Sequence, residues 1–315
     1  MKKVVILESI GIPAEKLEAL KAPFAQEAEF ISYDKTFDIE ALKEETRDAD
    51  AVILANMPLP AEVIAAAPRL QFIDVAFTGV DHIGLSAAKE RGIKVSNASG
   101  FSNEAVAELV IAMALSMMRN LSATKARVRA GGTKDGLIGC ELMGKTVGIV
   151  GYGRIGRRTG ELLHAFGCRI LQSSSHPHTD DPDYVTQVPL EELLAESDLV
   201  ILHTPLNDST RGLIDYEKLC KMKKTALLIN VARGPVTVED DLARALEEGV
   251  IAGAAVDVFT KEPPLPADTQ MLAAPNTLLT PHIAFATQES MLRRAEIVFA
   301  NLRAWFDGGQ NNIIL

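Results

Sequence analysis

Cysteine and tryptophan are scarce in this chain of 315 residues, which has three cysteines and one tryptophan. Cys140, Cys168 and Cys220 are far apart and form no C-x-x-C pair. An odd number of isolated cysteines excludes a simple disulfide framework and is typical of proteins in a reducing compartment. We therefore expect a cytoplasmic location.

Long apolar runs near the N-terminus and an excess of positive charge are also missing. The run of four apolar residues at 4–7, which ends at Glu8, is too short for the core of a signal peptide or for a membrane span. The net charge of −10 argues against a surface that binds nucleic acid or anionic lipid. The sequence thus predicts neither nucleic acid nor a membrane as a partner.

The composition that remains, 47% hydrophobic and 23% charged, is typical of a folded globular protein. A chain of this length exceeds a comfortable single core, so two domains are expected. Strand-like and helical patterns alternate throughout, which indicates α/β domains with parallel sheets covered on both faces. In the first hundred residues, strands are predicted at 4–7, 29–32, 51–54, 72–75 and 93–95, and helices at 13–21, 39–47, 60–67 and 85–91, with Pro13 and Pro60 in first turns.

A different pattern follows, because residues from 103 onward can form one helix of about 25 residues. Its middle is apolar nearly all round, which predicts burial against a second domain or a second subunit. After a glycine-rich link, the alternation resumes at residue 145, with six strands predicted near 147, 169, 199, 226, 252 and 277. A last helix at 288–306 would return to the first domain and make that domain discontinuous.

The most informative stretch is a G-x-G-x-x-G turn that lies between an apolar strand and a helical pattern. Gly151 permits a tight turn, Gly153 allows the backbone to approach a pyrophosphate, and Gly156 allows close packing of the helix on the strand. Arg154 and Ile155 begin the helix, whose first amides face an anion. Position 174, at the end of the next strand, is where a side chain that reads the ribose is expected. This order predicts a dinucleotide site, although glycine-rich turns also occur for steric reasons alone.

Three polar residues follow the later strands: Arg233, Glu262 and His282. Each alone has an ordinary structural explanation, as a helix cap, a solvated loop residue or a structural histidine. Together they supply a cation for a carboxylate, an acid/base, and a carboxylate that favours the protonated ring and fixes its orientation. We interpret them as the groups needed for hydride transfer between a nicotinamide and a 2-oxo or 2-hydroxy acid.

Nearly the whole chain resembles the D-isomer-specific 2-hydroxyacid dehydrogenase family. The motifs that carry the resemblance are FTGVDHI (77–83), NEAVAELVIAMAL (103–115), ELMGKTVGIVGYGRIG (141–156), LHTPLNDSTRGLID (202–215), NVARGPVTVEDDLARAL (230–246), AAVDVFTKEPP (254–264) and TPHIAFAT (280–287). The stretch at 281–290 is most similar to glycerate dehydrogenase and hydroxypyruvate (glyoxylate) reductase members.

The resemblance implies a homodimer of chains with two doubly wound domains. These are a flavodoxin-like substrate domain, from residues 1–100 and 284–315, and a Rossmann NAD(P)-binding domain, from residues 101–283. Arg233 would bind the substrate carboxylate and carbonyl, His282 would be the acid/base, and Glu262 its partner. The remaining implied contacts are the amides of Gly79 and Val80 at the substrate carboxylate, Arg154 and Ile155 at the pyrophosphate, His203, Thr204, Pro205 and Thr210 near the adenosine half, and Val231, Ala232 and Asp257 near the nicotinamide.

The chain departs from the family where the adenosine ribose is read. Ser174 replaces the aspartate usual in NAD-preferring members, and Ser175 stands where NADP-preferring members commonly have a basic residue, followed by His176. Without a carboxylate to repel a 2′-phosphate, we expect NADPH to be accepted and moderately preferred, more so at low pH as His176 becomes charged. His176 and His178 have a spacing found in metal sites, but no third ligand is evident and no metal is predicted.

Two classes of function remain in competition. The leading hypothesis is a reductase of glyoxylate, hydroxypyruvate or a similar small 2-oxo acid, which gives a D-2-hydroxy acid. The alternative is a dinucleotide-sensing binding protein of the same fold that has no metabolic turnover. The absence of an added tail or recognition segment weakly disfavours the alternative.

Overall fold

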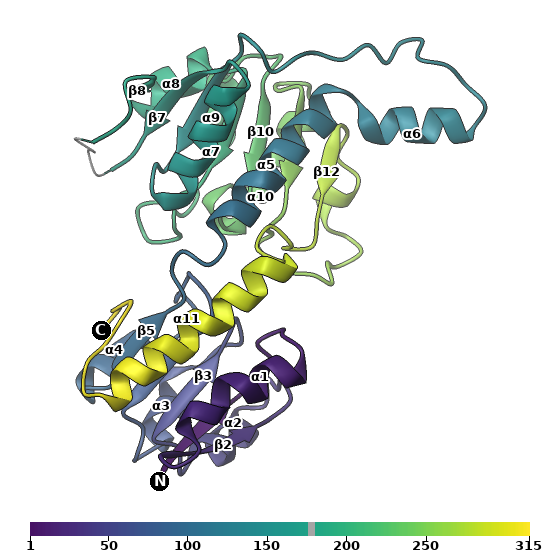
Figure 1. The fold of residues 1–315 in the computed structure, drawn as a ribbon. Coiled ribbons are helices and arrows are strands. Elements are labelled where there is room, and N and C mark those ends of the chain that lie inside the picture. The colour runs from purple at the N-terminus through teal and green to yellow at the C-terminus, as the bar shows by residue number, and fades with distance from the viewer. Residues whose placement is uncertain (176–179) are drawn as a thin grey trace. The chain divides into compact units, whose positions relative to one another are not determined.

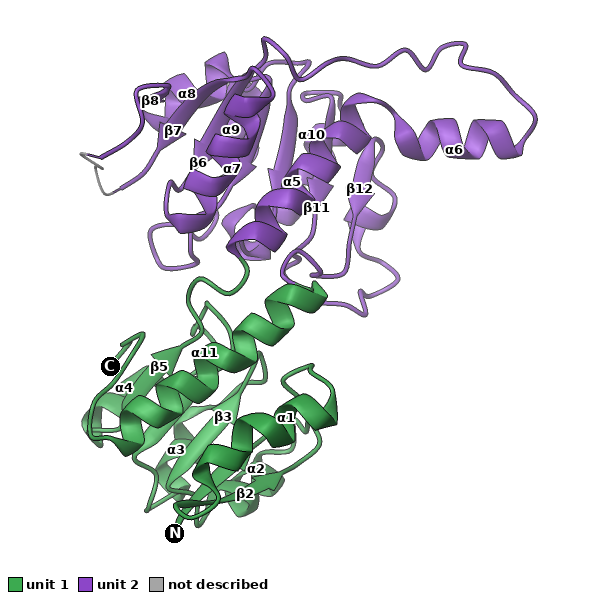
Figure 2. Cartoon of the chain, viewed as in Figure 1, with its two compact units in different colours: residues 1–102, 286–315 green, residues 103–285 purple. Residues whose placement is uncertain are grey.

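Strands and helices alternate along the chain as the sequence predicts. The computed structural model describes residues 1–175 and 180–315. The chain forms two compact units: unit 1 comprises Met1–Ser102 and Ala286–Leu315, and unit 2 comprises Asn103–Phe285 (Figure 2).

Unit 1 is built on a five-stranded sheet in which every pairing is parallel. Its strands are β1 (Lys2–Ile6), β2 (Ala28–Ser32), β3 (Ala51–Leu54), β4 (Phe72–Val75) and β5 (Lys94–Asn97), in the order β2-β1-β3-β4-β5. All residues of β3 and β4 are buried, because helices cover both faces of a parallel sheet. This strand order is that of the flavodoxin-like doubly wound fold.

The helices of unit 1 lie on both sides of this sheet. They are α1 (Ala14–Lys21), the short 3₁₀ helix η1 (Ala22–Phe24), α2 (Ile39–Thr46), α3 (Ala61–Ala66), α4 (Leu85–Glu90) and α11 (Gln288–Phe306). α1 contacts α11, whereas α2 contacts α3 and α3 contacts α4, in keeping with one group on each face (Figure 1). Pro13 and Pro60 stand at the N-cap of α1 and α3, and not in the first turn as predicted.

Helix α11 comes last in the chain but belongs to the core of unit 1. Trp305 stacks on Phe72 of β4 at a centroid distance of 5.2 Å, and Phe299 contacts Phe24 at 6.1 Å. Beyond α11 the chain runs along β5, where the amide of Ile314 donates to the carbonyl oxygen of Val95 at 2.8 Å. The end strand β5 therefore has its backbone groups covered by the C-terminal residues.

Unit 2 is built on a seven-stranded parallel sheet. Its strands are β6 (Thr146–Val150), β7 (Arg169–Ser173), β8 (Val185–Gln187), β9 (Leu199–Leu202), β10 (Leu227–Asn230), β11 (Gly253–Val256) and β12 (Thr277–Leu279), in the order β12-β11-β10-β9-β6-β7-β8. The sequence predicted six strands and missed β8, because none of its three residues is buried and the apolar pattern is absent. The two parallel sheets confirm the predicted α/β fold class, and this order is that of the doubly wound dinucleotide-binding fold with one added strand.

Two separate apolar layers cover the sheet of unit 2. Leu199 and Ile201 of β9 belong to the layer with α5 (Asn103–Met118) and α7 (Arg154–Ala165). Val200 and Leu202 belong to the opposite layer, because successive side chains of a strand point to opposite faces. That layer contains α8 (Leu190–Glu196), α9 (Tyr216–Lys221) and α10 (Glu239–Glu247), and η2 (Gly234–Val236) and η3 (Gln270–Leu272) contribute Val236 and Met271 to it.

The single long helix predicted from residue 103 is wrong. α5 ends at Met118, and α6 (Leu121–Arg129) continues after a bend of 56°. Asn120 lies in the left-handed region (φ 53°), a conformation that asparagine tolerates better than most residues and that stops an α-helix. The two helices therefore differ: α5 packs into unit 2, whereas α6 has no buried residue.

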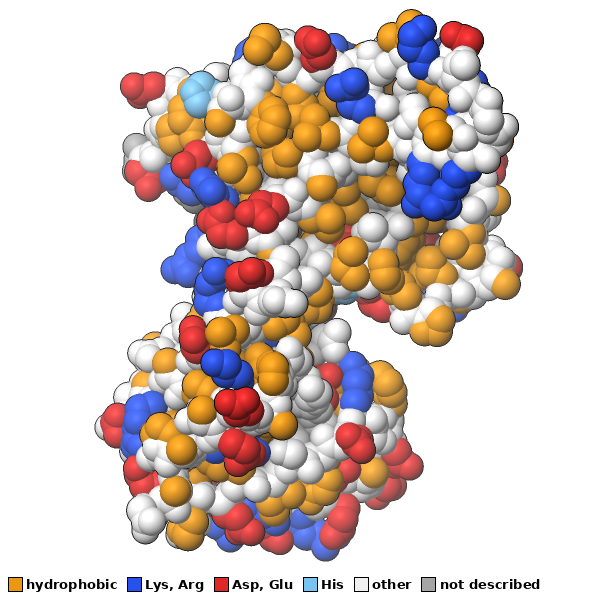
Figure 3. Space-filling view, turned by 45° about the vertical axis from the view of Figure 1, so that its right-hand side comes forward, with side chains coloured by type: hydrophobic (Ala, Val, Ile, Leu, Met, Phe, Trp, Pro, Cys, Tyr) orange, Lys and Arg blue, Asp and Glu red, His pale blue; other side chains and the backbone are white. Residues whose placement is uncertain are grey.

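Acidic, basic and apolar side chains are interspersed on the face of the molecule in Figure 3, with clusters of apolar groups on unit 2. Within the described residues, no single helix has both the length and the apolar composition to cross a membrane. Among the helices of the described ranges, only α5 and α6 taken together meet these criteria of length and composition, across their bend.

Candidate active site

The G-x-G-x-x-G turn joins β6 to α7, and two of its glycines are required by the backbone. Gly151 has φ +90°, and a Cβ there would lie 2.7 Å from the amide nitrogen of Thr204. A Cβ on Gly156 would lie 2.3 Å from the carbonyl oxygen of Gly151. Gly153 differs, because a Cβ there would meet nothing within 4 Å. The open space beside Gly153 and the helix start at Arg154 and Ile155 fit the pyrophosphate of a dinucleotide.

The expected ribose-reading position follows β7. The amide of Gly151 donates to the carbonyl oxygen of Ser173 at 2.8 Å, which places Ser174 and Ser175 beside the phosphate turn. His176 and His178 lie outside the described residues. The predictions that rest on these histidines therefore have no structural counterpart.

The segment after β9 contains His203, Thr204, Pro205 and Thr210. The imidazole of His203 hydrogen bonds to the hydroxyl of Thr159 on α7 at 2.9 Å, and burial lowers the pKa of His203 to about 3 although the residue keeps some exposed surface. The ring is therefore neutral. The hydroxyl of Thr210 donates to the carbonyl oxygen of Pro205 at 2.6 Å, which closes this loop on itself.

Asn230, the last residue of β10, shapes the loop that holds Arg233. The side-chain oxygen of Asn230 accepts from the amide of Ala232 at 3.1 Å, and its nitrogen donates to the carbonyl oxygen of Arg233 at 3.1 Å. The guanidinium of Arg233 donates to the carbonyl oxygen of Ala232 at 2.9 Å. Val231 is part of the same tight loop and is almost fully buried.

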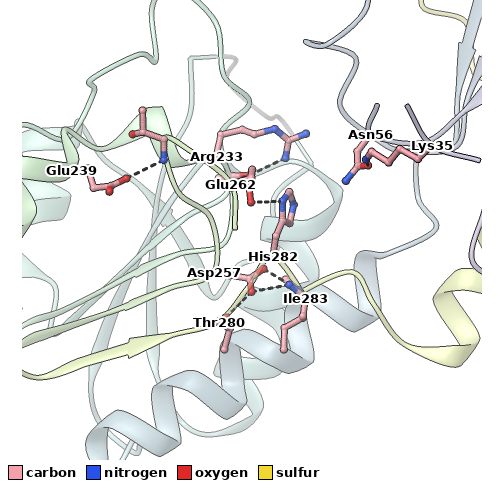
Figure 4. Close-up of polar contacts among 12 residues, drawn as sticks. Lys35, Asn56, Arg233, Glu239, Asp257, Glu262, Thr280, His282 and Ile283 are labelled. Atoms are coloured by element: carbon pink, nitrogen blue, oxygen red, sulfur yellow. Dashed lines mark hydrogen bonds and ion pairs between the residues drawn. The ribbon is translucent and has the colours of Figure 1, made fainter. Parts of the chain in front are cut away.

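Glu262 and His282 are in contact. The Nδ1 atom of His282 lies 3.1 Å from Oε2 of Glu262 (Figure 4). The imidazole is mostly buried and the carboxylate is about half exposed. Because a carboxylate only accepts hydrogen bonds, Nδ1 carries a hydrogen and Nε2 is left as the atom that gives or takes a proton.

Asp257 builds the turn on which His282 stands. Its carboxylate accepts from the hydroxyl of Thr280 at 2.5 Å and from the amides of Ile283 and Ala284 at 2.9 Å each. Its carbonyl oxygen accepts from the amide of His282 at 2.7 Å. Burial raises the pKa of Asp257, and these hydrogen bonds oppose the rise. The turn holds His282 in the left-handed region, at φ 56°.

Sequence reasoning missed the residues that hold these loops in place, namely Asn230, Thr280 and Glu239. The carboxylate of Glu239 accepts from the amide of Thr260 at 2.9 Å and so fixes the start of the loop that carries Glu262. A polar residue at the end of a buried strand is a signal that could have found Asn230.

The segment with Gly79 and Val80 belongs to unit 1, where it follows β4. The side chain of Asn97 donates to the carbonyl oxygen of Thr78 at 2.7 Å and holds the segment in place. Among the described residues, the amides of Gly79 and Val80 donate to no acceptor of the chain. Two free donors at the end of a strand suit a bound carboxylate.

The arrangement in unit 2 combines a guanidinium, an oriented imidazole and a phosphate turn at the carboxyl ends of parallel strands. Residues 111–284 match the model of the D-isomer specific 2-hydroxyacid dehydrogenase NAD-binding domain. The chain belongs to this family.

Similar proteins cover almost the full length of this family member. A hydroxypyruvate reductase of Blautia hydrogenotrophica is 34% identical to this chain, and the alignment covers 91% of this chain and 92% of the reductase. A glyoxylate reductase of Thermofilum pendens is 41% identical over 85% of this chain and 82% of its own. The crystal structure of the TT0316 protein from Thermus thermophilus is 34% identical, covers 99% of this chain and 100% of its own, and superimposes with a TM-score of 0.89.

Proposed function

We propose that this family member reduces a small 2-oxo acid of the glyoxylate or hydroxypyruvate type to the D-2-hydroxy acid, with NAD(P)H as the hydride donor. The observation that carries the proposal is the contact of Glu262 with His282 at the carboxyl edge of a dinucleotide-binding sheet. The bound dinucleotide supplies the hydride. The names of the relatives support the substrate type.

The proposed roles follow from the chemistry of each group. Arg233 binds the substrate carboxylate and polarises the carbonyl through its several donors. His282 gives its Nε2 proton to the carbonyl oxygen as the alcohol forms, while Glu262 keeps the ring oriented. Gly79 and Val80 offer their amides to the carboxylate.

We assign residues 101–283 to the NAD(P)-binding domain and residues 1–100 and 284–315 to the substrate domain. In the cofactor domain, Gly151, Gly153 and Gly156 would form the phosphate turn. The match of residues 111–284 to an NAD-binding domain supports the first assignment. The free amides of Gly79 and Val80 support the second.

For the coenzyme, we propose that NADPH is preferred over NADH. Ser174 has no carboxylate to repel a 2′-phosphate, and its hydroxyl can donate to a phosphate oxygen. We expect kcat/KM to be higher with NADPH, and Ser174→Asp to reverse the preference. A clear NADH preference of the unaltered protein would contradict this.

We further propose that the chain forms a homodimer in the cytoplasm. Helix α6 has no buried residue, and the exposed apolar residues Leu121, Val128 and Ile138 lie on it or on the segment that follows. The three cysteines are free, as in a reducing compartment. Analytical ultracentrifugation tests the dimer.

The function itself is tested by turnover, which separates a reductase from a dinucleotide-sensing protein. The purified chain should oxidise NADPH or NADH in the presence of glyoxylate or hydroxypyruvate. His282→Ala should remove most of this activity, because loss of general acid help costs a factor of about 10² to 10⁴. Arg233→Ala should also lower it strongly, because loss of a charge-assisted contact costs about 1.5 to 3 kcal/mol. Dinucleotide binding, measured by fluorescence, should persist in both. Near-normal turnover in a variant would remove that residue from the mechanism.

A further inference from the structure

A polar cluster in unit 1, formed by Glu8, Lys35 and Asn56, lies at the carboxyl ends of β1, β2 and β3. Oε1 of Glu8 accepts from the amides of Ala55 and Met57, at 2.8 and 2.7 Å. Its other oxygen, Oε2, lies 3.3 Å from Nζ of Lys35. The ammonium group of Lys35 in turn donates to Oδ1 of Asn56 at 2.9 Å (Figure 4).

This chain of contacts decides which end of the Asn56 amide points outward. An ammonium group has three donors and no acceptor, so Asn56 must present its oxygen to Lys35. Its nitrogen, with two N–H donors, then faces away from Lys35. Asn56 is exposed, and within the described residues this nitrogen donates to no other group of the chain.

The Asn56 loop lies beside the segment that carries Gly79 and Val80. β3 and β4 are adjacent strands, with Leu54 opposite Val75. The ring of His82 contacts the carbonyl oxygen of Ala55 at 2.9 Å, and this ties the two loops together. The hydroxyl of Thr78 is buried and has no partner in the described chain. Unsatisfied donors therefore gather at this edge of unit 1.

We propose that the Asn56 carboxamide, held in one orientation by Lys35 and Glu8, donates a hydrogen bond to an oxygen on the third carbon of the substrate. The protein then favours a 3-hydroxy-2-oxo acid over an acid that has only hydrogen or a methyl group there. This inference rests on the proposed function and on the proposed binding of the substrate carboxylate by the amides of Gly79 and Val80. Asn56 is the specificity residue, and Lys35 and Glu8 are positioning residues.

A purely structural role does not explain the contact of Lys35 with Asn56. The side chain of Lys35 is 37% exposed and that of Glu8 only 6%, so Lys35 also offsets the charge of a buried carboxylate. Glu8 already fixes the loop backbone through two amides without help from Lys35. Beyond this charge, Lys35 adds the orientation of the Asn56 amide.

The test compares kcat/KM for hydroxypyruvate with kcat/KM for pyruvate, which has a methyl group in place of the hydroxymethyl group. In Asn56→Ala, the ratio of the two should fall about fivefold, as expected for one lost hydrogen bond, mainly through a higher KM for hydroxypyruvate. In Lys35→Met, the Asn56 amide is free to flip by 180°. The ratio of kcat/KM for hydroxypyruvate to that for pyruvate should then fall about twofold if both orientations are equally populated. Lys35→Arg keeps a donor with no acceptor and should restore the ratio.

The matched control is Lys43→Met, which removes another lysine of unit 1 that is paired with Glu40 and Glu62 on the surface. It should leave the ratio unchanged. If the unaltered protein turns over no 2-oxo acid, the proposed function fails and this inference with it. If it turns over both acids and Asn56→Ala lowers them equally or not at all, the inference alone is overturned.

Discussion

The contact between His282 and Glu262 makes a prediction about activity. A carboxylate oxygen 3.1 Å from Nδ1 fixes the orientation of the ring that gives the proton. Glu262→Ala removes this acceptor, so kcat should fall by part of the factor of about 10² to 10⁴ that general acid help contributes. Glu262→Gln keeps an oxygen that can accept from Nδ1 and should retain more of the activity. Steady-state kcat and KM of the three proteins check this.

A suitable control is Glu191→Gln, which removes a carboxylate of unit 2 that is paired with Lys221 on the surface. Its kcat and KM should match those of the unaltered protein. A Glu262→Ala variant that is as active as Glu262→Gln would show that Glu262 does not orient the ring.

Residue types at the site could be predicted from the sequence, because polar side chains just after apolar strands gather at one edge of a parallel sheet. Their partners could not. The sequence gives no sign that Asp257 directs both carboxylate oxygens into the turn at 280–284, since that turn follows a different strand. The contacts of Lys35 could not be predicted either, because its two partners are more than twenty residues away in sequence.

Among the elements of unit 1, β4 and α11 are joined by a buried polar contact. Nδ2 of Asn301 donates to Oδ1 of Asp74 at 3.0 Å, while Oδ2 of Asp74 is buried and has no partner in the described chain. Burial raises the pKa of Asp74 well above its usual range, and the Asn301 hydrogen bond opposes this. The folded state therefore binds the Asp74 proton more tightly than the unfolded state does.

This difference sets the sign of a stability effect. The contribution of Asp74 is fully present below its unfolded pKa and is lost as pH rises toward its folded pKa. The asparagine in Asp74→Asn cannot ionise. The difference in the free energy of unfolding, variant minus unaltered protein, should therefore increase with pH, by at most about 1.4 kcal/mol per pH unit for one proton. Urea unfolding at several pH values measures this. Asp34→Asn, on an exposed loop, is the control, and a difference that does not change with pH would contradict the assignment.

Elements that carry a strong apolar pattern were predictable. The predicted ranges at 51–54, 72–75 and 199–202 coincide with β3, β4 and β9, whose residues are all buried. The bend between α5 and α6 was not predictable, because Met118 and Leu121 continue a helical pattern and one left-handed residue, Asn120, interrupts it. Periodicity reports burial, and it says little about a single backbone angle.

For the whole molecule, the division into two units predicts the response to cofactor. Each unit has its own sheet, and the chain passes between the units only at 102–103 and 285–286. We expect calorimetry to resolve two unfolding transitions, one for each unit. NADPH should raise the transition temperature of unit 2 only. At one hundred times the dissociation constant, the stabilisation should be about 2.7 kcal/mol.

Gly153→Ala offers a matched variant for this measurement. The added Cβ meets nothing within 4 Å, so the fold should tolerate it, but it occupies the space proposed for the pyrophosphate. Without ligand, the unfolding temperature of unit 2 should be unchanged in this variant. The increase in that temperature caused by NADPH should be smaller than in the unaltered protein. A single transition in the unaltered protein, or a shift of both, would contradict independent cofactor binding by unit 2.

The late position of α11 has a consequence during synthesis on the ribosome. Unit 2 is complete once residue 285 has emerged, whereas unit 1 still waits for α11 and for the segment that covers β5. Until then Phe72 lacks its stacking partner Trp305, and the backbone of β5 is open to pairing. The unit whose translation begins first is thus the last to be completed, and until then its open strand edge and exposed apolar surface favour aggregation.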